Sequence, residues 1–426
     1  MRGEEGAPRE GARPWRIAAW CFYDWANSAY PTVIGTFVFA TYFTQGVAPD
    51  PVTGASRWGV AMAVSGLLVG LLSPVFGAIA DRTGGRRRWL AGFTVLAALA
   101  AGGLWTVEPD PAFMLRGLVL VILGTLAFEL GTVFYNAMLP TLAPPRMIGR
   151  VSGWGWGLGY VGGLFCLVAC LWLIRADPPP FGLASGNAEA VRATSVLVAL
   201  WYAGFALPLL LAVPGDKPTG VGIAQAVREG IGAILRVLPE LRSQPVITRF
   251  LIARLLYAEG LNTLFAFGAI YAAGTFGMDT EDVIGLGIAI NVTAGLGAAL
   301  FAFADDWFGS RNVVLVSVLS LMVIGAALLF VTSAAAFWAL ALPLGLFFGP
   351  AQAASRTLMG RLAPKDKLGE YYGLFALTGR AVSFVGPAVL AAATAAFSSQ
   401  RAGMATILFF LGAGAALLWT VREERP

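Results

Sequence analysis

The sequence predicts an all-α membrane protein with twelve transmembrane helices in two pseudo-symmetric halves of six. Hydrophobic residues make up 58% of the 426 residues and charged residues only 12%, whereas soluble domains contain about 25% charged residues. A helix of about 20 apolar residues spans a hydrocarbon core. Apolar runs of spanning length follow one another near residues 17–45, 57–80, 89–107, 114–139, 150–174, 193–213, 247–275, 282–304, 312–332, 335–358, 371–397 and 402–421.

Glycine spacing also favours a helical bundle. The chain contains 53 glycines, and small residues let helices approach closely in lipid. Gly155, Gly159 and Gly163 recur every fourth residue, so they share one face of the fifth predicted helix. We expect this face to pack closely against a neighbouring helix.

The loops between the runs predict how the chain crosses the membrane. Basic residues concentrate in alternate loops, which the positive-inside rule assigns to the cytosol together with both termini. The inner segments hold Arg82, Arg86, Arg87, Arg88, Arg146, Arg150, Lys217, Arg228, Arg236, Arg242, Arg311, Arg361, Lys365, Lys367, Arg422 and Arg425. The outer segments hold Arg57, Arg116, Arg175, Arg192 and Arg401. The net charge of +5 therefore reflects topology, and we expect no nucleic-acid partner.

A break after the sixth run predicts the domain boundaries. The segment from Pro214 to Pro218 ends that helix and precedes an apolar stripe at helical spacing, formed by Ile223, Val227, Ile231, Ile234, Leu235 and Leu238. Such an amphipathic helix lies flat on a membrane surface. We expect a cytosolic tail over residues 1–16, a six-helix bundle over 17–213, a cytosolic linker over 214–246, a second bundle over 247–421 and a cytosolic tail over 422–426.

Short motifs recur at similar spacing in the two halves. Ala80-Asp81, Gly85 and Arg87 recur as Ala304-Asp305, Gly309 and Arg311, and Leu142-Ala143-Pro144 recurs as Leu362-Ala363-Pro364. A looser echo relates Tyr23, Asp24 and Asn27 to Tyr257, Glu259 and Asn262. Two parallel halves related by an axis normal to the membrane are the plan of a major-facilitator transporter, which this chain resembles.

The loop after the second run resembles the major-facilitator motif of Gly, three residues, Asp, a basic residue, any residue, Gly and two basic residues. The resemblance implies that Asp81 pairs with a helix amino terminus and nearby arginines, and holds the cytosolic side shut in one state. A carboxylate at a helix start contributes about 0.3–1 kcal/mol, enough to bias a balanced two-state equilibrium. The gate candidates are Asp81, Arg82, Arg86 and Arg87, with Asp305, Asp306 and Arg311 in the second half.

Two expectations follow for these loops. The second copy of the motif has lost most of its basic residues and gained Asp306, so we expect its gate to be the weaker one. The alternative for both copies is a plain positively charged inner loop without a gating role.

Ionisable side chains inside the apolar runs are the candidates for the transport site. Asp24 lies roughly 10 Å inside the first run, where a carboxylate costs on the order of 3 kcal/mol, so it must face protein or water. The other acids and arginines inside runs are Glu129, Arg254, Glu259 and Arg380. In the superfamily that the chain resembles, helices one, four, seven and ten line the cavity, which adds Tyr23, Asn27, Asn136, Asn262 and Arg356.

These groups have three possible roles that the sequence leaves open. Acids and arginines in one cavity suit a zwitterion, whose carboxylate binds arginine and whose ammonium binds an acid. A desolvated glutamate can instead carry a proton. Third, acids and arginines can simply neutralise each other between helices, with Asp24 paired to Arg380 or another arginine. Arg254 and Glu259 are too far apart around their helix to pair, so each needs a partner on another helix.

The echo between the halves gives one geometric expectation. We expect the acid and amide of the first helix, Asp24 and Asn27, to meet those of the seventh, Glu259 and Asn262, across the central cavity. A lipid-facing Asp24 would contradict this expectation.

Within the superfamily the chain resembles the vacuole-effluxer family, which includes the fungal autophagy-related exporter of vacuolar amino acids. The residues that carry the resemblance are Tyr23–Tyr30, Ile290–Ala298, Gly349–Arg356, Tyr371-Tyr372-Gly373 and Gly386-Pro387. They lie in both halves, so the resemblance covers nearly the whole chain. It implies export of an amino acid or a similar zwitterion. We expect a bacterial-type inner membrane as the location.

These observations predict a secondary transporter of a small polar solute that works by alternating access. The sequence leaves open whether its transport is coupled to a proton. A lipid or amphiphile translocator on the same fold is the main alternative, and a non-transporting sensor is a weaker one. The sequence has no Walker, HExxH or GxSxG motif and no histidine, so we expect no enzymatic activity, no cofactor and no metal. We expect a monomer whose partners are its small-molecule solute and membrane lipid.

Overall fold

The computed structural model describes residues 13–183, 186–214, 219–380 and 382–423. Within these ranges the chain is helical, strands are absent, and 11 helices are long and apolar enough to cross a membrane. The α-helices are α1 (Pro14–Asn27), α2 (Phe39–Tyr42), α3 (Pro51–Thr83), α4 (Arg86–Gly103), α5 (Met114–Leu142), α6 (Ile148–Arg175), α7 (Glu189–Ala212), α8 (Ile223–Ser243), α9 (Pro245–Phe276), α10 (Thr280–Phe308), α11 (Ser310–Leu328), α12 (Ala334–Leu362), α13 (Leu368–Arg380), α14 (Val385–Phe397) and α15 (Gln400–Trp419).

The first apolar run is helical but does not form one continuous α-helix. After α1, a π-helical segment covers Tyr30–Phe37, and α2 leads into a second π-helical segment, Phe43–Val47. Pro31 stands in the first turn of the first π-helical segment, where its missing N–H interrupts regular α-helical bonding. This run, together with the long helices, accounts for the twelve predicted membrane segments.

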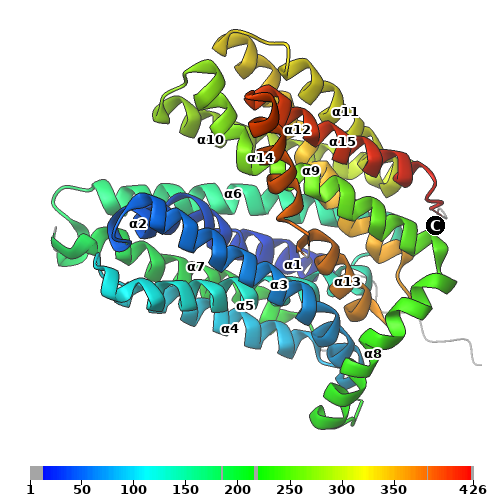
Figure 1. Cartoon of the computed structure of the whole chain (residues 1–426). Helices are drawn as coiled ribbons and strands as arrows, with labels where there is room; N and C mark the ends of the chain where they lie inside the picture. Colours follow the sequence, from blue (N-terminus) through cyan, green and yellow to red (C-terminus); the bar gives the residue numbers. More distant parts are fainter. Residues whose placement is uncertain (1–12, 184–185, 215–218, 381, 424–426) are drawn as a thin grey trace, which may run out of the picture.

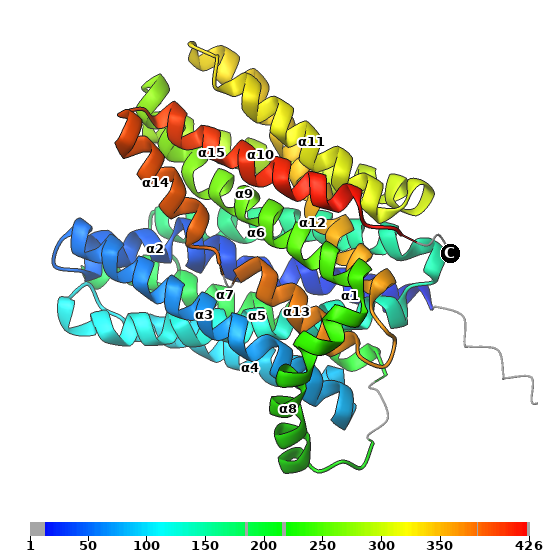
Figure 2. The ribbon, with the colours of Figure 1, turned by 45° about the vertical axis from the view of Figure 1, so that its right-hand side comes forward.

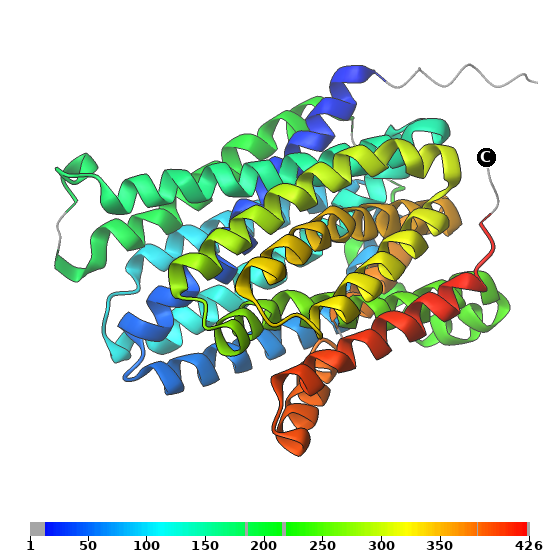
Figure 3. The same cartoon turned by 90° about the horizontal axis from the view of Figure 1, so that it is seen from above.

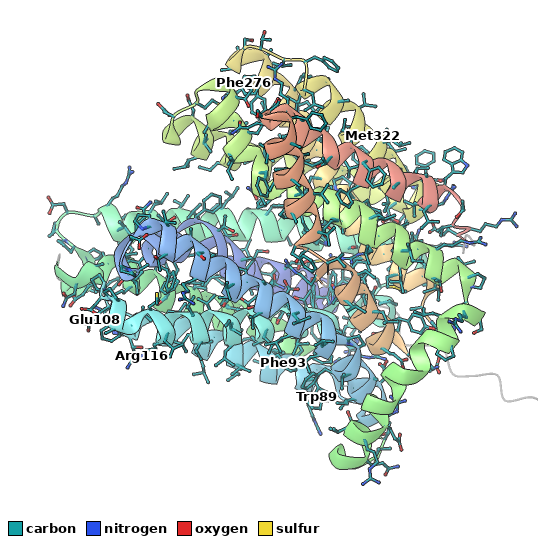
Figure 4. The ribbon with its side chains drawn as sticks, in the orientation of Figure 1. Trp89, Phe93, Glu108, Arg116, Phe276 and Met322 are labelled. Carbon is teal, nitrogen blue, oxygen red and sulfur yellow. The ribbon has the colours of Figure 1, made fainter. Side chains whose placement is uncertain are left out.

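The helices form two groups that lie side by side (Figure 1). The first group, α1 to α7, has its own buried core, and the second group, α9 to α15, has another that also takes in Val133 and Ala137 of α5. One end of both groups, which we call the terminal end, holds the start of α1 and the ends of α3 and α15 (Figure 2). The distal end holds Glu108 in the first group and Phe276 in the second (Figure 4).

Glycines let the two groups meet backbone to backbone along two seams. At the first seam α6 runs beside α10 (Figure 3), and a Cβ on Gly153 would lie 2.4 Å from the carbonyl oxygen of Ala298. At the second seam α3 runs beside α13, and a Cβ on Gly77 would lie 2.0 Å from the carbonyl oxygen of Gly369. No larger residue fits either seam without separating the helices.

The predicted glycine face of the fifth helix is confirmed. It packs on the first helix, where a Cβ on Gly155 would lie 2.7 Å from Asp24 Oδ2, and one on Gly159 would lie 2.7 Å from Ser28 Oγ. Gly163 stands equally close to Thr32. α6 thus presents one glycine face to α1 and another to α10.

The eleventh predicted helix, near 371–397, is broken in the middle. α13 ends at Arg380 and α14 begins at Val385, and α14 turns away from the line of α13 (Figure 2). α13 packs mainly on α3 of the first group, whereas α14 packs on α15 and α9 of the second. A helix that stops inside a membrane leaves backbone groups that other residues must bind.

The predicted linker helix corresponds to α8, which lies against the terminal end of α3. The N–H of Thr219 donates to the Thr83 carbonyl at 3.2 Å, and Arg82 pairs with Glu229 at 3.3 Å. Most of the predicted apolar stripe, namely the side chains of Ile223, Ile231, Ile234, Leu235 and Leu238, lies outside what the structure describes, as do residues 1–12 and 424–426 of the predicted tails.

Candidate functional site

Asp24 on α1 and Arg356 on α12 form an ion pair that joins the two groups of helices. Arg356 Nη1 donates to Asp24 Oδ2 at 3.0 Å, and the arginine side chain is only 3% exposed. The same nitrogen donates to Asn136 Oδ1 on α5 at 3.4 Å. Arg356 Nε and Nη2 donate to the hydroxyl and carbonyl oxygens of Ser152 on α6, at 3.0 and 2.6 Å. We call Asp24, Asn136, Ser152 and Arg356 the buried cluster.

Aromatic rings enclose the guanidinium of the buried cluster. Arg356 Cζ lies 4.8 Å from the ring centroid of Trp20, 5.6 Å from that of Tyr135 and 5.7 Å from that of Trp156. Trp20 and Tyr135 stack at 4.3 Å, and the polar group of each ring donates to the carbonyl of the other residue. The rings exclude water and add cation–π attraction, which is strongest where the cation is desolvated.

A second ion pair joins Glu129 on α5 to Arg380 at the end of α13. Arg380 Nη2 donates to Glu129 Oε1, and the side chain of Arg380 is 47% exposed while that of Glu129 is 12% exposed. Within the described chain, Glu129 is the one acceptor bonded to this guanidinium. We call these two residues the open pair.

Two polar side chains of α9 bind the carbonyl side of the break in the eleventh helix. Arg254 donates to the carbonyl of Phe375 and to Thr378 Oγ1, the latter at 2.8 Å, and its Cζ lies 3.4 Å from the Phe375 ring centroid. Asn262 Nδ2 donates to the carbonyl of Gly379 at 3.3 Å. The Gly379 carbonyl is one of the last four of α13, which the helix leaves without an intrahelical donor, whereas Phe375 lies about one turn earlier.

Glu259 binds the other side of the break. Its Oε1 accepts a hydrogen bond of 2.6 Å from the N–H of Gly386, which lies in the first turn of α14. The residue is 2% exposed. A carboxylate at a helix start is stabilised by the helix dipole and by the free N–H groups there. The expectation that Arg254 and Glu259 take partners from another helix is confirmed.

The structure corrects the expected meeting of acid and amide faces across the cavity. Asp24 binds Arg356, so it pairs with another arginine than Arg380, as one of the open alternatives allowed, and it reaches the second group through α12. Glu259 and Asn262 bind the backbone of the broken helix inside their own group. The echo between the halves identifies helix faces, but it carries no information about where a neighbouring helix breaks and needs polar partners.

Tyr23 and Asn27 also lie away from an open cavity. The Tyr23 hydroxyl is bonded to Thr94 at 2.7 Å and to Tyr202 at 3.0 Å, and the residue is fully buried within the first group. Asn27 is buried, and its Oδ1 accepts a long bond of 3.5 Å from Ser28 Oγ.

Asp81 binds the amino terminus of α13, which is the contact that the motif resemblance implies. Its carboxylate accepts from the N–H of Gly369 at 3.0 Å and from that of Glu370 at 2.9 Å. Arg86 Nη2 donates to the same carboxylate at 2.8 Å. These bonds join the first group to the second at the terminal end.

The remaining arginines of the motif bind elsewhere. Arg82 pairs with Glu229 of α8, and Arg87 donates to the Val213 carbonyl at 2.7 Å, so both lie toward the linker. Arg311 of the second copy donates its backbone N–H to Glu423 at 2.7 Å and its guanidinium to the Trp419 carbonyl. It therefore fixes the end of α15 and does not contact Asp305 or Asp306.

The second copy of the motif also has charged partners, although its own loop holds few basic residues, and the expected weaker gate stays a prediction. Asp306 accepts from the N–H of Gly149 at 2.8 Å and pairs with Arg150 at 2.7 Å, both on α6. Arg361 of α12 pairs with Asp305 at 3.2 Å and with Asp306 at 3.4 Å. The basic groups come from other loops, so counting arginines within the motif underestimated the contact.

A cavity of about 220 Å³ lies mainly within the second group, and Thr36, Phe37 and Tyr160 border it from the first group. Its lining is largely apolar, with Phe265 and Phe348 of the second group facing it. Thr36, Tyr160 and Asn291 are among its few polar lining residues.

A wider apolar groove of about 840 Å³ lies against α1, α6 and α10. Tyr160 and Asn291 line both the groove and the cavity. The two spaces therefore share a wall at the seam between the groups.

Sequence reasoning missed several residues of these sites. Ser152 carries no charge and stands in a glycine-rich run, so no pattern distinguished it. Trp20, Tyr135 and Trp156 looked like ordinary packing aromatics. Arg150 and Arg361 counted only toward topology, although their positions at the terminal ends of runs could have paired them with Asp306.

Comparison with known proteins gives a consistent match. The family model described as "Vacuole effluxer Atg22 like" matches residues 46–426. The uncharacterized MFS-type transporter YxiO of Bacillus subtilis is 24% identical over 416 residues, which cover 95% of this chain and 94% of that one. Autophagy-related protein 22 of Cryptococcus neoformans var. neoformans is 24% identical over 296 residues, which cover 65% of this chain and 53% of that one.

A solved structure shows the same fold. The MFS proton:xylose symporter XylE bound to 6-bromo-6-deoxy-D-glucose superimposes with a TM-score of 0.74 over 96% of both chains, at 14% identity. The likeness at this identity concerns the fold alone, and it confirms the predicted major-facilitator architecture.

Proposed function

The chain belongs to the vacuole effluxer Atg22-like family of major-facilitator transporters, and from that premise we propose that it moves a small zwitterion, such as an amino acid, by alternating access. Family and fold are those of transporters and not of enzymes. The solute, its direction of movement and the location of the binding site are the parts that we propose.

The open pair carries this proposal. Arg380 presents a half-exposed guanidinium, and Glu129 presents a carboxylate beside it. A zwitterion can place its carboxylate on Arg380 and its ammonium on Glu129 through charge-assisted hydrogen bonds. The open pair joins the two groups of helices. A solute that replaces the bond between Arg380 and Glu129 therefore changes how the groups are held together. A ligand shifts a conformational equilibrium only if it binds the two conformations with different affinity, and this exchange of partners provides such a difference.

The contacts of the seams support alternating access. At the terminal end, Asp81 binds α13 across one seam and Asp306 binds α6 across the other. Beyond Arg380, α14 packs mainly on helices of its own group. This arrangement corresponds to a transporter that is closed at the terminal end, with the buried cluster as a further closed layer.

The orientation follows from the basic loops. We place the terminal end in the cytosol, because most arginines and lysines lie there. Export across a bacterial-type inner membrane is the direction and location that we propose, with the protein acting as a monomer. Fungal relatives of this family are named for autophagy, but the chain spans only about half the length of the one compared above.

Reconstituted vesicles test the proposal. A radiolabelled amino-acid mixture should enter proteoliposomes faster than protein-free vesicles, and Arg380→Gln should abolish most of the difference. Arg116→Gln is a matched control, because Arg116 is an exposed arginine at the distal end whose described hydrogen bond goes to the Thr106 carbonyl. Wild-type vesicles that move amino acids no faster than protein-free vesicles would refute the proposal.

The wider apolar groove against α1, α6 and α10 favours one second candidate, a translocator of lipids or other amphiphiles. Such a protein needs an apolar path from the lipid to its cavity, and the groove shares Tyr160 and Asn291 with the cavity. Thermal-shift screening of amino acids against single-chain and double-chain lipids separates the two functions. Stabilisation by lipids alone would favour the second candidate.

A further inference from the structure

Glu259 differs from five other acids of the described chain in having no arginine or lysine at ion-pair distance. The acids with an arginine at ion-pair distance are Asp24, Asp81, Glu129, Asp305 and Asp306. The bond described for Glu259 comes from a neutral group, the backbone N–H of Gly386. No lysine or arginine of the described chain lies at ion-pair distance from it, although the residue is 2% exposed.

An interior carboxylate without a counter-charge can change its protonation state. Burial of an unpaired charge is costly in an apolar interior, and a buried acid avoids that cost by taking up a proton. The N–H of Gly386 and the start of α14 favour the charged form, but only with partial charges. Neither form of Glu259 is therefore fixed by a permanent ion pair, unlike Asp24 or Glu129.

Thr263 offers an unused hydroxyl oxygen that can accept from the protonated form of Glu259. Its hydroxyl oxygen is fully buried and has no hydrogen-bond partner in the described part of the chain. Thr263 follows Glu259 by one helical turn and shares its face of α9. A Cβ on Gly386 would lie 2.1 Å from Thr263 Oγ1 and 3.0 Å from Glu259 Oε1, so both groups border one small space. A carboxylic O–H needs an acceptor, and a carboxylate does not.

The charged groups of the neighbouring helices are bound elsewhere. On α9 itself, Arg254 binds Thr378 and the end of α13. On α13, Arg380 binds Glu129, and on α12, Arg356 binds Asp24.

The charged groups of α15 and α10 are also bound elsewhere. α15 presents Leu411 to the adjacent Gly260, while its Arg401 binds the Val331 carbonyl. The acids Asp305 and Asp306 of α10 are engaged with arginines at the terminal end. On α14 the group nearest to Glu259 is the Gly386 backbone.

We propose that Glu259 is the residue that takes up and releases the proton coupled to transport, and that its protonation loosens α14 from α9. The inference rests on the proposed function, because coupling presupposes transport. A proton from water adds to a carboxylate oxygen of Glu259, and the new O–H donates to Thr263 Oγ1. The Gly386 N–H is left with a neutral acceptor, which binds it more weakly than the carboxylate does. No other bond forms or breaks.

The wall of the cavity lies close to Glu259 along the chain. Leu264 and Leu411 line the cavity; Leu264 follows Thr263 in the sequence, and Leu411 packs against Gly260. Because α14 packs on α9 and α15 beyond the break, a weaker bond at Gly386 affects the part of the second group that borders the distal end.

Infrared difference spectra of the whole protein in lipid nanodiscs test the assignment without a solute. Comparison of acidic and alkaline buffer should show the C=O stretch of a buried carboxylic acid in the wild type, and Glu259→Gln should remove it. Glu129→Gln is the matched control and should leave it in place. A band that survives in Glu259→Gln, or that disappears only in Glu129→Gln, overturns the proposal.

Thr263→Val keeps the assignment testable if Glu259→Gln does not fold. This variant keeps the side-chain shape and removes the acceptor of the protonated form. The midpoint of the Glu259 titration should therefore move to a proton concentration roughly fivefold higher. Glu259→Asp should retain a titrating band with a changed midpoint. An unchanged midpoint in Thr263→Val contradicts the role given to the hydroxyl.

Transport separates this inference from the proposed function. In vesicles, an imposed pH gradient should accelerate movement of the radiolabelled amino-acid mixture by wild-type protein, and Glu259→Gln should no longer respond to the gradient. If wild type moves no amino acid, the proposed function fails while the infrared result still stands. If both proteins respond equally to the gradient, the proton assignment fails while the proposed function stands.

Discussion

The buried cluster and the open pair connect the same two groups of helices by opposite means. In the buried cluster, Arg356 is 3% exposed and bound by side chains of three first-group helices. In the open pair, Arg380 is 47% exposed and bound by one carboxylate. A desolvated arginine with a partner on each of its three guanidinium nitrogens has little to offer a solute, whereas a half-exposed one can exchange its partner at little cost.

The difference teaches that an acid and an arginine between helices do not by themselves mark a binding site. What we expect to distinguish a solute site is an incomplete set of partners together with an exposed side chain. By this criterion Asp24 belongs to the contacts that hold the groups together, and Glu129 with Arg380 is the site that we propose for the solute.

The largest effect is expected from removing the arginine of the buried cluster. Arg356→Ala leaves Asp24 as an unpaired buried charge, so the protein should lose roughly 3–5 kcal/mol of stability. Thermal unfolding in nanodiscs measures this loss. The double variant with Asp24→Asn should recover part of it, because the uncompensated charge is gone. Equal losses in the single and double variants would show that the ion pair is not what stabilises the seam.

Removing the arginine of the open pair should affect transport more than stability. Arg380→Gln takes away a charge-assisted contact worth about 1.5–3 kcal/mol, so amino-acid transport should fall roughly 10- to 100-fold. The unfolding temperature without solute should change little, because exposed ion pairs contribute about 0–1 kcal/mol. Initial rates in proteoliposomes check the first statement and calorimetry the second. A destabilised protein with normal transport would reverse the roles given to the two sites.

A methyl group placed beside the buried cluster should disturb it without removing any charge. A Cβ on Gly155 would lie 2.7 Å from Asp24 Oδ2, so Gly155→Ala should cost about 1–3 kcal/mol through overpacking. Gly204→Ala on α7 is the control, since a Cβ there meets nothing within 4 Å. That control should be neutral or slightly stabilising in thermal unfolding. A neutral Gly155→Ala would mean that α1 and α6 separate more easily than the seam suggests.

The smallest effect is expected at the terminal end. Asp81→Asn removes the negative charge at the start of α13, which stabilises the closed terminal end by about 1 kcal/mol. The fraction of molecules in which the terminal end is open should therefore rise roughly fivefold. Spin labels at Arg88→Cys and Lys365→Cys, two exposed positions in different groups, report the distance between the groups at the terminal end. The three native cysteines are buried. Unchanged distances in Asp81→Asn and changed ones in Asp306→Asn would place the gate in the second copy alone.

The fold was accessible from the sequence because its determinants are local. Membrane-length apolar runs, basic loops and the recurring Ala-Asp motif each depend on nearby residues, and they predicted the helical architecture. The contact of Asp81 with a helix start also followed, because the motif resembles one whose partner is known. The π-helical interruption after Asn27 and the break after Arg380 did not follow, because neither has a local signal strong enough to distinguish it from a continuous helix.

The site was only partly accessible for the same reason. Depth in an apolar run correctly marked Asp24, Glu129, Glu259 and Arg380 as unusual, but their partners depend on how distant helices are brought together. Arg254, Glu259 and Asn262 lie on α9 where they bind a break in another helix, and no pattern within α9 reveals that break. Ser152 belongs to the buried cluster because α6 packs against α12, and the sequence does not show that packing.

Solute-dependent stabilisation tests the central claim most directly. Thermal unfolding of the wild type, Arg380→Gln and Arg116→Gln would be followed with and without a saturating amino-acid mixture. We expect the mixture to stabilise the wild type and Arg116→Gln, and to leave the unfolding temperature of Arg380→Gln unchanged. Stabilisation of Arg380→Gln equal to that of the wild type would contradict the assignment of the open pair as the solute site.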